Sequence, residues 1–189
     1  MSEPARKAAT YEDVLAAPSH MVAEILGGEL VLTPRPGPRH ARTGSKLGVS
    51  LGPFDVDGEG PGGWWILDEP ELHLEAVGRP VVPDLAGWRV ERLPELPDTA
   101  YFTLAPDWIC EVISPGTEAV DRAEKMPLYA ASGVKHAWLV DPVVETLEVF
   151  RLEDARWSLV TTLRGAATAH VEPFDALPLA LGPLWRRKA

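Results

Sequence analysis

Apolar residues along this chain gather in short runs separated by turn-forming residues, a pattern typical of a sheet with a few helices. Their composition and spacing predict strands at residues 64–67, 71–75, 81–88, 107–113, 136–140, 146–152 and 157–163. The run at 107–113 is the most apolar, so we expect it to be central. Two further strands are expected within residues 21–32, joined by a tight turn at Gly27 and Gly28.

Helices are predicted where capping residues or helical spacing occur. Residues 10–13 (Thr-Tyr-Glu-Asp) resemble a capping box and open a short helix that Pro18 stops. A second helix is expected at residues 40–51, and a third from about Glu118. Pro127 either kinks this third helix or opens a separate short one.

The mixture of strands and helices predicts a single domain of the α/β (α+β) class, with a mixed central β-sheet flanked by helices. With 189 residues, the chain is long enough for one well-buried core. We assign this domain to residues 10–185. Residues 1–9 are expected to form a flexible N-terminal tail, and residues 186–189 a basic C-terminal tail.

Charge limits the ways in which this protein can bind nucleic acid. Lys and Arg number 18 and Asp and Glu number 28, which gives a net charge of −10. This balance counts against broad, non-specific binding, because such binding needs many cations to neutralise phosphates. It leaves room for a local basic patch at Arg35, Arg39, Arg42 and Lys46, although these residues can equally serve solubility.

Cys110 is the only cysteine, so no disulfide can form within the chain. Its apolar neighbours predict a buried thiol that serves as a small hydrophobic group. The N-terminus carries no apolar segment of the kind found in signal peptides, and no apolar run is long enough to span a bilayer. We therefore expect a cytoplasmic protein that does not bind membranes.

Two carboxylates within apolar, strand-like sequence are the strongest candidates for chemistry. Asp84 lies in the predicted strand 81–88 and Glu111 in the predicted central strand, and Lys125 follows in the next helix. A buried carboxylate is costly unless it is paired or binds a metal. Two carboxylates offer the hard oxygen ligands that Mg²⁺ prefers, and a lysine can orient water or offset charge at phosphorus. The set predicts a Mg²⁺-dependent phosphodiesterase site.

Each member of this set also has a purely structural interpretation. Asp84 follows Pro83 and can simply begin a turn, and Glu111 can pair with a structural arginine such as Arg122. Lys125 alone is typical of a solvated helix residue. The three together, in this order and on these elements, favour the catalytic interpretation.

Four more side chains are weaker candidates. Glu24 and Glu29 flank the Gly-Gly turn, and either can extend a metal site. His40 opens a helix and can contact phosphate or the acidic cluster, and Glu71 can be a third carboxylate or an outward strand residue. A zinc site is not expected, because the remaining histidines lack metal-ligand spacing. Ser114 has no evident histidine partner and lies in no nucleophile elbow.

Taken together, these motifs resemble the Uma-type restriction endonuclease family, a branch of the PD-(D/E)XK nucleases. The resemblance rests on Pro83-Asp84, on 111–117 (Glu-Val-Ile-Ser-Pro-Gly-Thr), Asp121, Lys125, Tyr129, Gly133-Val134 and 138–142 (Trp-Leu-Val-Asp-Pro), with Glu24 to Leu30 and His40 upstream. It extends roughly from Tyr11 to Leu163. Gly27 and Pro127 depart from the family pattern without removing a proposed catalytic group.

This resemblance implies a restriction-endonuclease-like fold and Mg²⁺-dependent hydrolysis of DNA, with Mn²⁺ as a possible substitute. It implies that Asp84 and Glu111 ligate the metal, that Lys125 is the catalytic lysine, displaced from its usual position at residue 113, and that Glu24 is an accessory catalytic carboxylate. His40, Glu71 and Glu29 remain possible accessory residues.

Two alternatives stay open: a non-catalytic binding or scaffold protein that keeps the nuclease fold, and a nuclease acting on RNA or on unusual DNA structures. A homodimer is expected, because cutting both strands of a duplex usually takes two sites related by twofold symmetry. Trp64, Trp65 and the apolar segment 177–185 are either its contact surfaces or part of the monomer's own core.

Overall fold

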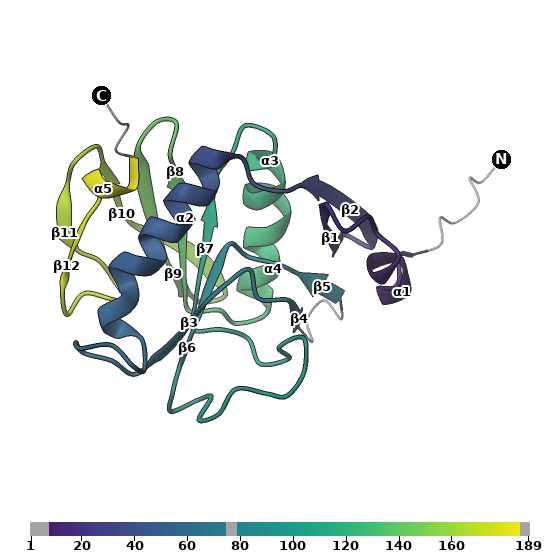
Figure 1. Ribbon diagram of the computed structural model, residues 1–189, viewed down its shortest axis with the longest axis horizontal. Coiled ribbons are helices and arrows are strands. Elements are labelled where there is room, and N and C mark those ends of the chain that lie inside the picture. Colours follow the sequence, from purple (N-terminus) through teal and green to yellow (C-terminus); the bar gives the residue numbers. More distant parts are fainter. Residues whose placement is uncertain (1–7, 75–78, 186–189) are drawn as a thin grey trace.

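A six-stranded mixed sheet forms the centre of the computed structural model, which describes residues 8–74 and 79–185 (Figure 1). The strand order is β10-β9-β8-β7-β6-β3; β7 and β8 are parallel, and every other neighbouring pair is antiparallel. The strands are β3 (Trp64–Asp68), β6 (Leu85–Arg89), β7 (Trp108–Val112), β8 (His136–Asp141), β9 (Thr146–Glu153) and β10 (Arg156–Arg164). The predicted basic tail and most of the predicted N-terminal tail lie outside the described residues.

Strand β7 is an interior strand of this sheet and all five of its residues are buried, which confirms the expectation from its apolar sequence. Its side chains alternate between the two faces, as in any strand. Trp108, Cys110 and Val112 belong to one core cluster, and Ile109 belongs to the other. Glu111 therefore points to the same face as Ile109, into an apolar layer.

Helices cover both faces, so the predicted fold class is confirmed (Figure 1). Leu47 and Leu51 of α2 pack into the first cluster, and Met126, Leu128 and Tyr129 of α4 pack into the second. The first cluster is completed by the C-terminal segment. The additional elements are α2 (Pro38–Leu51), η1 (Gly52–Phe54), α3 (Glu118–Val120), η2 (Asp121–Lys125), α4 (Met126–Ala131), β11 (Thr168–His170), β12 (Pro178–Ala180) and α5 (Gly182–Trp185).

The N-terminal part forms a hairpin that projects from the main body beside α3 (Figure 1). The hairpin consists of β1 (Met21–Leu26) and β2 (Glu29–Pro34), and the short helix α1 (Tyr11–Leu15) precedes it. Gly27 and Gly28 have φ of 55° and 90°, which side-chain-bearing residues rarely adopt, so the predicted Gly-Gly turn is confirmed. The predicted capping box is also present, because the Asp13 carboxylate accepts a hydrogen bond from the backbone N–H of Thr10.

The predicted continuous strand 81–88 is wrong. The chain forms β5 (Arg79–Val81), which pairs with β4 (Leu72–Leu74), and then breaks before β6 begins at Leu85. Pro83 has no N–H to donate to a sheet ladder, which explains the break. The N–H of Val82 instead donates to the Glu24 carboxylate. Asp84 therefore lies just before a strand rather than inside one.

The third predicted helix is continuous through Pro127 and contains a π-helical turn, η2, between α3 and α4. The N–H of Met126 donates to the carbonyl of Asp121, five residues earlier. A proline lacks the amide of a regular helix and its ring clashes with the carbonyl four residues before it. The wider π turn relieves this conflict, and such turns often occur at functional sites.

Smaller differences concern element ends and the apolar surfaces. The helix predicted from His40 begins at Pro38, in the first-turn position that suits proline. Strand β4 is shorter than predicted, and Glu75 lies outside the described residues. Trp64 and, within 177–185, Leu179, Leu181, Leu184 and Trp185 are buried in the monomer's core, as the second interpretation held.

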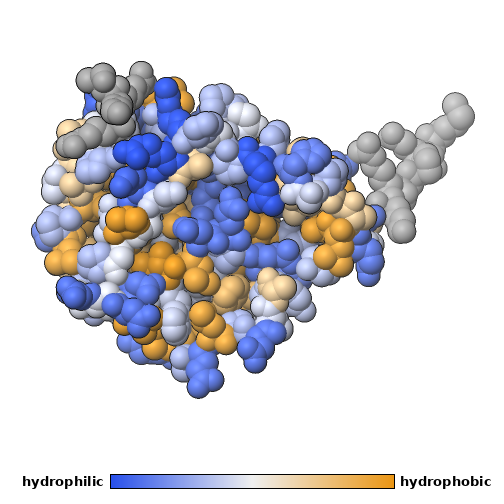
Figure 2. Space-filling model, in the orientation of Figure 1, coloured by the Kyte–Doolittle hydropathy of each residue, from blue (hydrophilic) through white to orange (hydrophobic). Residues whose placement is uncertain are grey.

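Two observations concern the exterior. In the described part of the chain, the helices are all too short or too polar to cross a membrane. Hydrophobic residues on the face shown in Figure 2 are scattered among hydrophilic ones.

Candidate functional site

Strands β6 and β7 bring Asp84 and Glu111 together. Their antiparallel register pairs Leu85 with Cys110, so one further step along the ladder places Asp84 opposite Glu111. Residues that lie directly opposite each other on two antiparallel strands point to the same face of the sheet. The backbone N–H of Val112 donates to Oδ2 of Asp84 at 2.6 Å, which fixes this carboxylate against β7. The two carboxylates thus meet on the face covered by α3 and α4.

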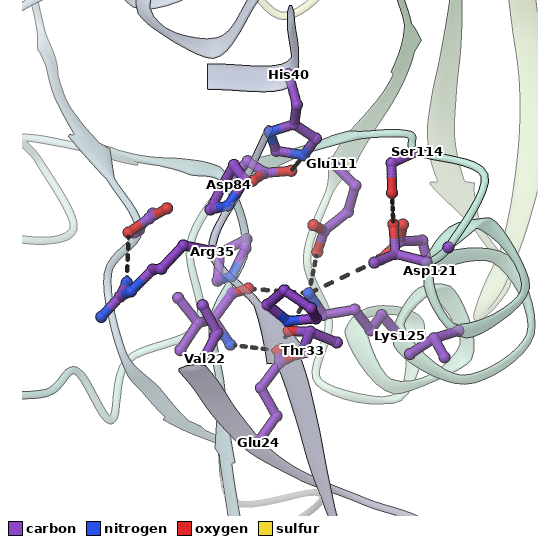
Figure 3. A pocket seen from close by; sticks show the side chains of 18 of the residues that line it. Val22, Glu24, Thr33, Arg35, His40, Asp84, Glu111, Ser114, Asp121 and Lys125 are labelled. Carbon is purple, nitrogen blue, oxygen red and sulfur yellow. Dashed lines mark hydrogen bonds and ion pairs between the residues drawn. The ribbon is translucent and has the colours of Figure 1, made fainter. Parts of the chain in front are cut away.

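His40 approaches the same carboxylate from the first turn of α2. Its Nε2 lies 3.3 Å from Oδ2 of Asp84, and Figure 3 shows the ring beside that carboxylate. Burial lowers the pKa of His40, but the hydrogen bond and the negative charge of Asp84 outweigh this effect and raise it. The candidate accessory histidine therefore does lie in the site.

Lys125 lies among three carboxylates, as the dashed lines in Figure 3 help to show. Its Nζ is 3.1 Å from Oε1 of Glu24, 3.1 Å from Oε1 of Glu111 and 3.9 Å from Oδ1 of Asp121. The lysine side chain is only 6% exposed. Lys125 thus reaches the carboxylates even though Pro127 follows it closely. The sequence alternative in which Glu111 pairs with Arg122 is wrong, since Arg122 pairs with Glu118 and Glu148.

Glu24 and Lys125 also fix the chain segment that carries Asp84. Oε1 of Glu24 accepts a hydrogen bond from the N–H of Val82 at 2.8 Å, and Nζ of Lys125 donates to the Val82 carbonyl at 2.9 Å. Both backbone groups of Val82 are therefore bound by the side chains that form the ion pair. This links the hairpin, the helix and the segment before β6 in one network.

Sequence reasoning left two members of this network without a role. Asp121 is buried and lines the pocket, and Tyr129 donates its hydroxyl to Oε1 of Glu111 at 2.6 Å. Both are spaced four residues from Lys125, and residues four apart on a helix are neighbours. That spacing is the signal that could have identified them.

Burial and charge shift the ionisation of these groups. Burial raises the pKa of Glu111, while the nearby ammonium of Lys125 opposes that change. Burial likewise raises the pKa of Asp121, from 3.8 to about 6. Burial lowers the pKa of Lys125, but the carboxylates of Glu111, Glu24 and Asp121 outweigh it, so the pKa lies above its usual value. Lys125 therefore stays protonated at neutral pH.

These groups open into a pocket of about 340 Å³. The pocket is bounded on one side by the hairpin and the segment after it, and on the other by the start of α3 and η2. At its rim, Nη1 of Arg35 pairs with Glu69 at 3.3 Å (Figure 3). The polar side chains that line it are Glu24, Thr33, Arg35, His40, Glu69, Asp84, Glu111, Ser114, Thr117, Asp121 and Lys125.

Two of the weaker candidates lie elsewhere. Glu29 is exposed at the end of the Gly-Gly turn and does not line the pocket. Glu71 also lies outside the lining; it accepts a hydrogen bond from the Tyr11 hydroxyl at 2.8 Å and contacts His73 at 2.7 Å. Ser114 lines the pocket, and its hydroxyl contacts that of Thr117.

The donor set fits Mg²⁺ better than zinc. Asp84 and Glu111 supply hard oxygen atoms, and Mg²⁺ commonly takes only one or two protein carboxylates and leaves its other positions to water and phosphate. No cluster of three or more His, Cys, Asp or Glu side chains suited to a metal ion occurs among residues 8–74 and 79–185. A site built on two carboxylates is consistent with that finding.

The fold and the pair of facing carboxylates define a restriction-endonuclease-like α/β protein. Residues 9–182 match the Uma2 family, described as "Putative restriction endonuclease", and the chain belongs to this family. In structure it is similar to "a putative nuclease belonging to DUF820 from Anabaena variabilis", with a TM-score of 0.73 and 22% sequence identity. The similarity covers 94% of this chain and 97% of that one. Comparison with curated proteins gave no significant match.

Proposed function

We propose that this protein is a Mg²⁺-dependent endonuclease that hydrolyses phosphodiester bonds in DNA, with Mn²⁺ as a substitute metal. The observation that carries the proposal is the buried ammonium of Lys125 held next to Glu111, which itself lies opposite Asp84. Membership in the Uma2 family and the likeness to a nuclease fold support it. The combination of two carboxylates and one lysine is also that of the PD-(D/E)XK nucleases.

In this proposal Asp84 and Glu111 hold the metal, which when bound supplies Lewis-acid charge and favours deprotonation of the attacking water. The bond from the water oxygen to phosphorus forms in line as the bond to the leaving oxygen breaks; the proton of the attacking water passes to solvent, and the leaving oxygen takes up a proton from solvent. Because the pKa of Lys125 is raised, its role is to offset negative charge that develops at phosphorus rather than to accept a proton.

The other residues position these groups. Glu24 and Asp121 hold the ammonium of Lys125, and Tyr129 orients Glu111 through its hydroxyl. His40 contacts Oδ2 of Asp84, the oxygen that also accepts the N–H of Val112. In this proposal Glu24, to which the family resemblance assigns the role of an accessory carboxylate, acts through Lys125.

Binding of the phosphate backbone would fall to cations near the pocket. Arg35 lies at the rim, and Arg39 and Arg42 are exposed on α2 close to His40. Two strands of a duplex require two cuts, so we also propose a homodimer for duplex cleavage. Equilibrium sedimentation of the purified protein tests this last part.

The test is cleavage of labelled single-stranded and duplex DNA with Mg²⁺, with Mn²⁺ and with EDTA. We expect metal-dependent cleavage by the wild type, and none by Asp84→Asn or Glu111→Gln. Glu118→Gln is the matched control, because Glu118 lies outside the pocket and its side chain is 50% exposed. Thermal melts establish that each variant is folded.

A second candidate function is a non-catalytic binding or scaffold protein. The observation that favours it is that the ammonium of Lys125 already pairs with both Glu24 and Glu111, in a chain with a net charge of −10. Titration of Mn²⁺ by calorimetry separates the two. Binding to the wild type that is lost in folded Glu111→Gln supports the nuclease, whereas no binding and no cleavage by the wild type support the scaffold.

A further inference from the structure

The pocket has an apolar side that the proposed chemistry does not use. Val22 of the hairpin, Pro36 after it and Val120 of α3 line the pocket together with the carboxylates and Lys125. Val22 pairs with Thr33 across the hairpin and shares a face with Glu24, whereas Leu32 pairs with Ala23 and so carries its side chain on the opposite face. Figure 3 shows Val22 and Thr33 beside Glu24, so the hairpin brings the apolar side close to the acidic groups.

The reactive groups lie below the protein surface. Side-chain exposure is 2% for Glu111 and 6% for Lys125, and Asp84 reaches only 19%. A phosphate that reacts here must enter the pocket, and the nucleoside attached to it must follow at least part of the way. At about 340 Å³ the pocket is near the lower end of the range for small-ligand sites, so it suits one nucleotide rather than a duplex segment.

The cations that line the pocket give little of the attraction that duplex binding normally uses, and the exposed Arg39 and Arg42 lie outside the lining. Lys125 is surrounded by carboxylates, and Arg35 is paired with Glu69. Binding through the phosphate backbone requires several unpaired cations. Contact between a base face and apolar side chains is an alternative source of affinity, but stacked bases in a duplex hide their faces.

From this we infer the substrate class, and the inference rests on the proposed function. We propose that the reacting nucleotide is unpaired, as in a single strand, a loop or a frayed end, and that its base or sugar packs against Val22, Pro36 and Val120. Because a single strand needs only one cut, a monomer is sufficient for this substrate.

The experiment compares one labelled oligonucleotide as a single strand, as a duplex and as a duplex with a central unpaired bubble. Cleavage is measured with Mn²⁺, and binding by fluorescence anisotropy with Ca²⁺. We expect the single strand and the bubble to be preferred over the duplex in both assays. Val22→Ala should weaken binding of the single strand roughly tenfold, as expected for the loss of two methyl groups that the nucleotide buries. The control Val144→Ala makes the same change at a position that is 64% exposed and outside the pocket, and it should change nothing.

The outcomes distinguish this inference from the proposed function. Preferred binding of the single strand, weakened in Val22→Ala, without any cleavage would refute the nuclease and retain the unpaired-nucleotide site. Equal cleavage of the duplex and the single strand, unaffected by Val22→Ala, would overturn the inference and retain the nuclease. Failure to bind any of the three oligonucleotides overturns the inference as well.

Discussion

Replacing Lys125 by methionine removes the one ammonium that touches Glu24, Glu111 and Asp121 while keeping an apolar side chain of similar length. The three carboxylates then remain buried without this counter-charge, and the Val82 carbonyl loses its hydrogen bond from Nζ. Removing one partner of a buried ion pair costs about 3–5 kcal/mol. For a chain of this size, 1 kcal/mol corresponds to roughly 2–4 °C in Tm, so we expect a fall of roughly 6–20 °C.

The loss should depend on pH in a defined direction. Burial already raises the pKa values of Glu111 and Asp121, and the ammonium of Lys125 opposes this change, so without the ammonium both values rise further above those in the unfolded chain. The folded state then binds protons that the unfolded state does not, so stability increases as pH falls. The deficit of Lys125→Met relative to the wild type should therefore be smaller at about pH 5 than at about pH 8.

Urea unfolding followed by tryptophan fluorescence measures both effects. Lys135→Met is the matched control, because Lys135 is exposed and lies outside the pocket. Adding Glu111→Gln to Lys125→Met should recover part of the lost stability, since one buried charge disappears. If Lys125→Met unfolds at the same urea concentration as Lys135→Met at about pH 8, the lysine is not the counter-charge of this cluster and the proposed site is wrong.

Two further predictions concern the partners of this lysine. Tyr129→Phe removes the hydroxyl that donates to Glu111 at 2.6 Å, which should cost about 1–3 kcal/mol in urea unfolding; an unchanged midpoint would show that the bond contributes nothing. Asp121 has a pKa raised from 3.8 to about 6, so it takes up a proton on folding between those values and the wild type loses stability as pH rises through that window. Asp121→Asn should lose this part of the pH dependence, and unfolding curves that respond to pH exactly as the wild type's do would contradict it.

The fold followed from local sequence more completely than the site did. Apolar runs separated by turn residues located the strands, and the Gly-Gly pair located the hairpin, because these signals act over a few residues. The apolar pattern alone does not show the break at residues 82–84, where Pro83 has no N–H for a sheet ladder. The amide and carbonyl of Val82 are satisfied by Glu24 and Lys125, which are distant in sequence.

For the site, residue type and order identified Asp84, Glu111 and Lys125, and the resemblance identified Glu24. The spacing of four residues places Asp121 and Tyr129 on the helix face of Lys125, but it does not show that this face meets Glu24 and Glu111, which are distant in sequence. Glu71 alternates with apolar residues in the sequence, as a metal ligand on a strand would. In the structure it lies outside the pocket and contacts Tyr11 and His73. Only the tertiary structure therefore shows which of several carboxylates in similar sequence settings belong to the site.

The π turn explains how a lysine on a helix serves a site built on strands. Asp121, Lys125 and Tyr129 are spaced by four residues and are all buried towards Glu24 and Glu111. In a regular helix of 3.6 residues per turn, each step of four rotates the side chain by about 40° beyond a full turn, so three such residues drift around the axis. The wider turn at residues 121–125 drifts the other way and offsets the regular step that follows. Pro127 therefore does not turn Lys125 away from the site. It favours the helix geometry that keeps Asp121, Lys125 and Tyr129 on one face.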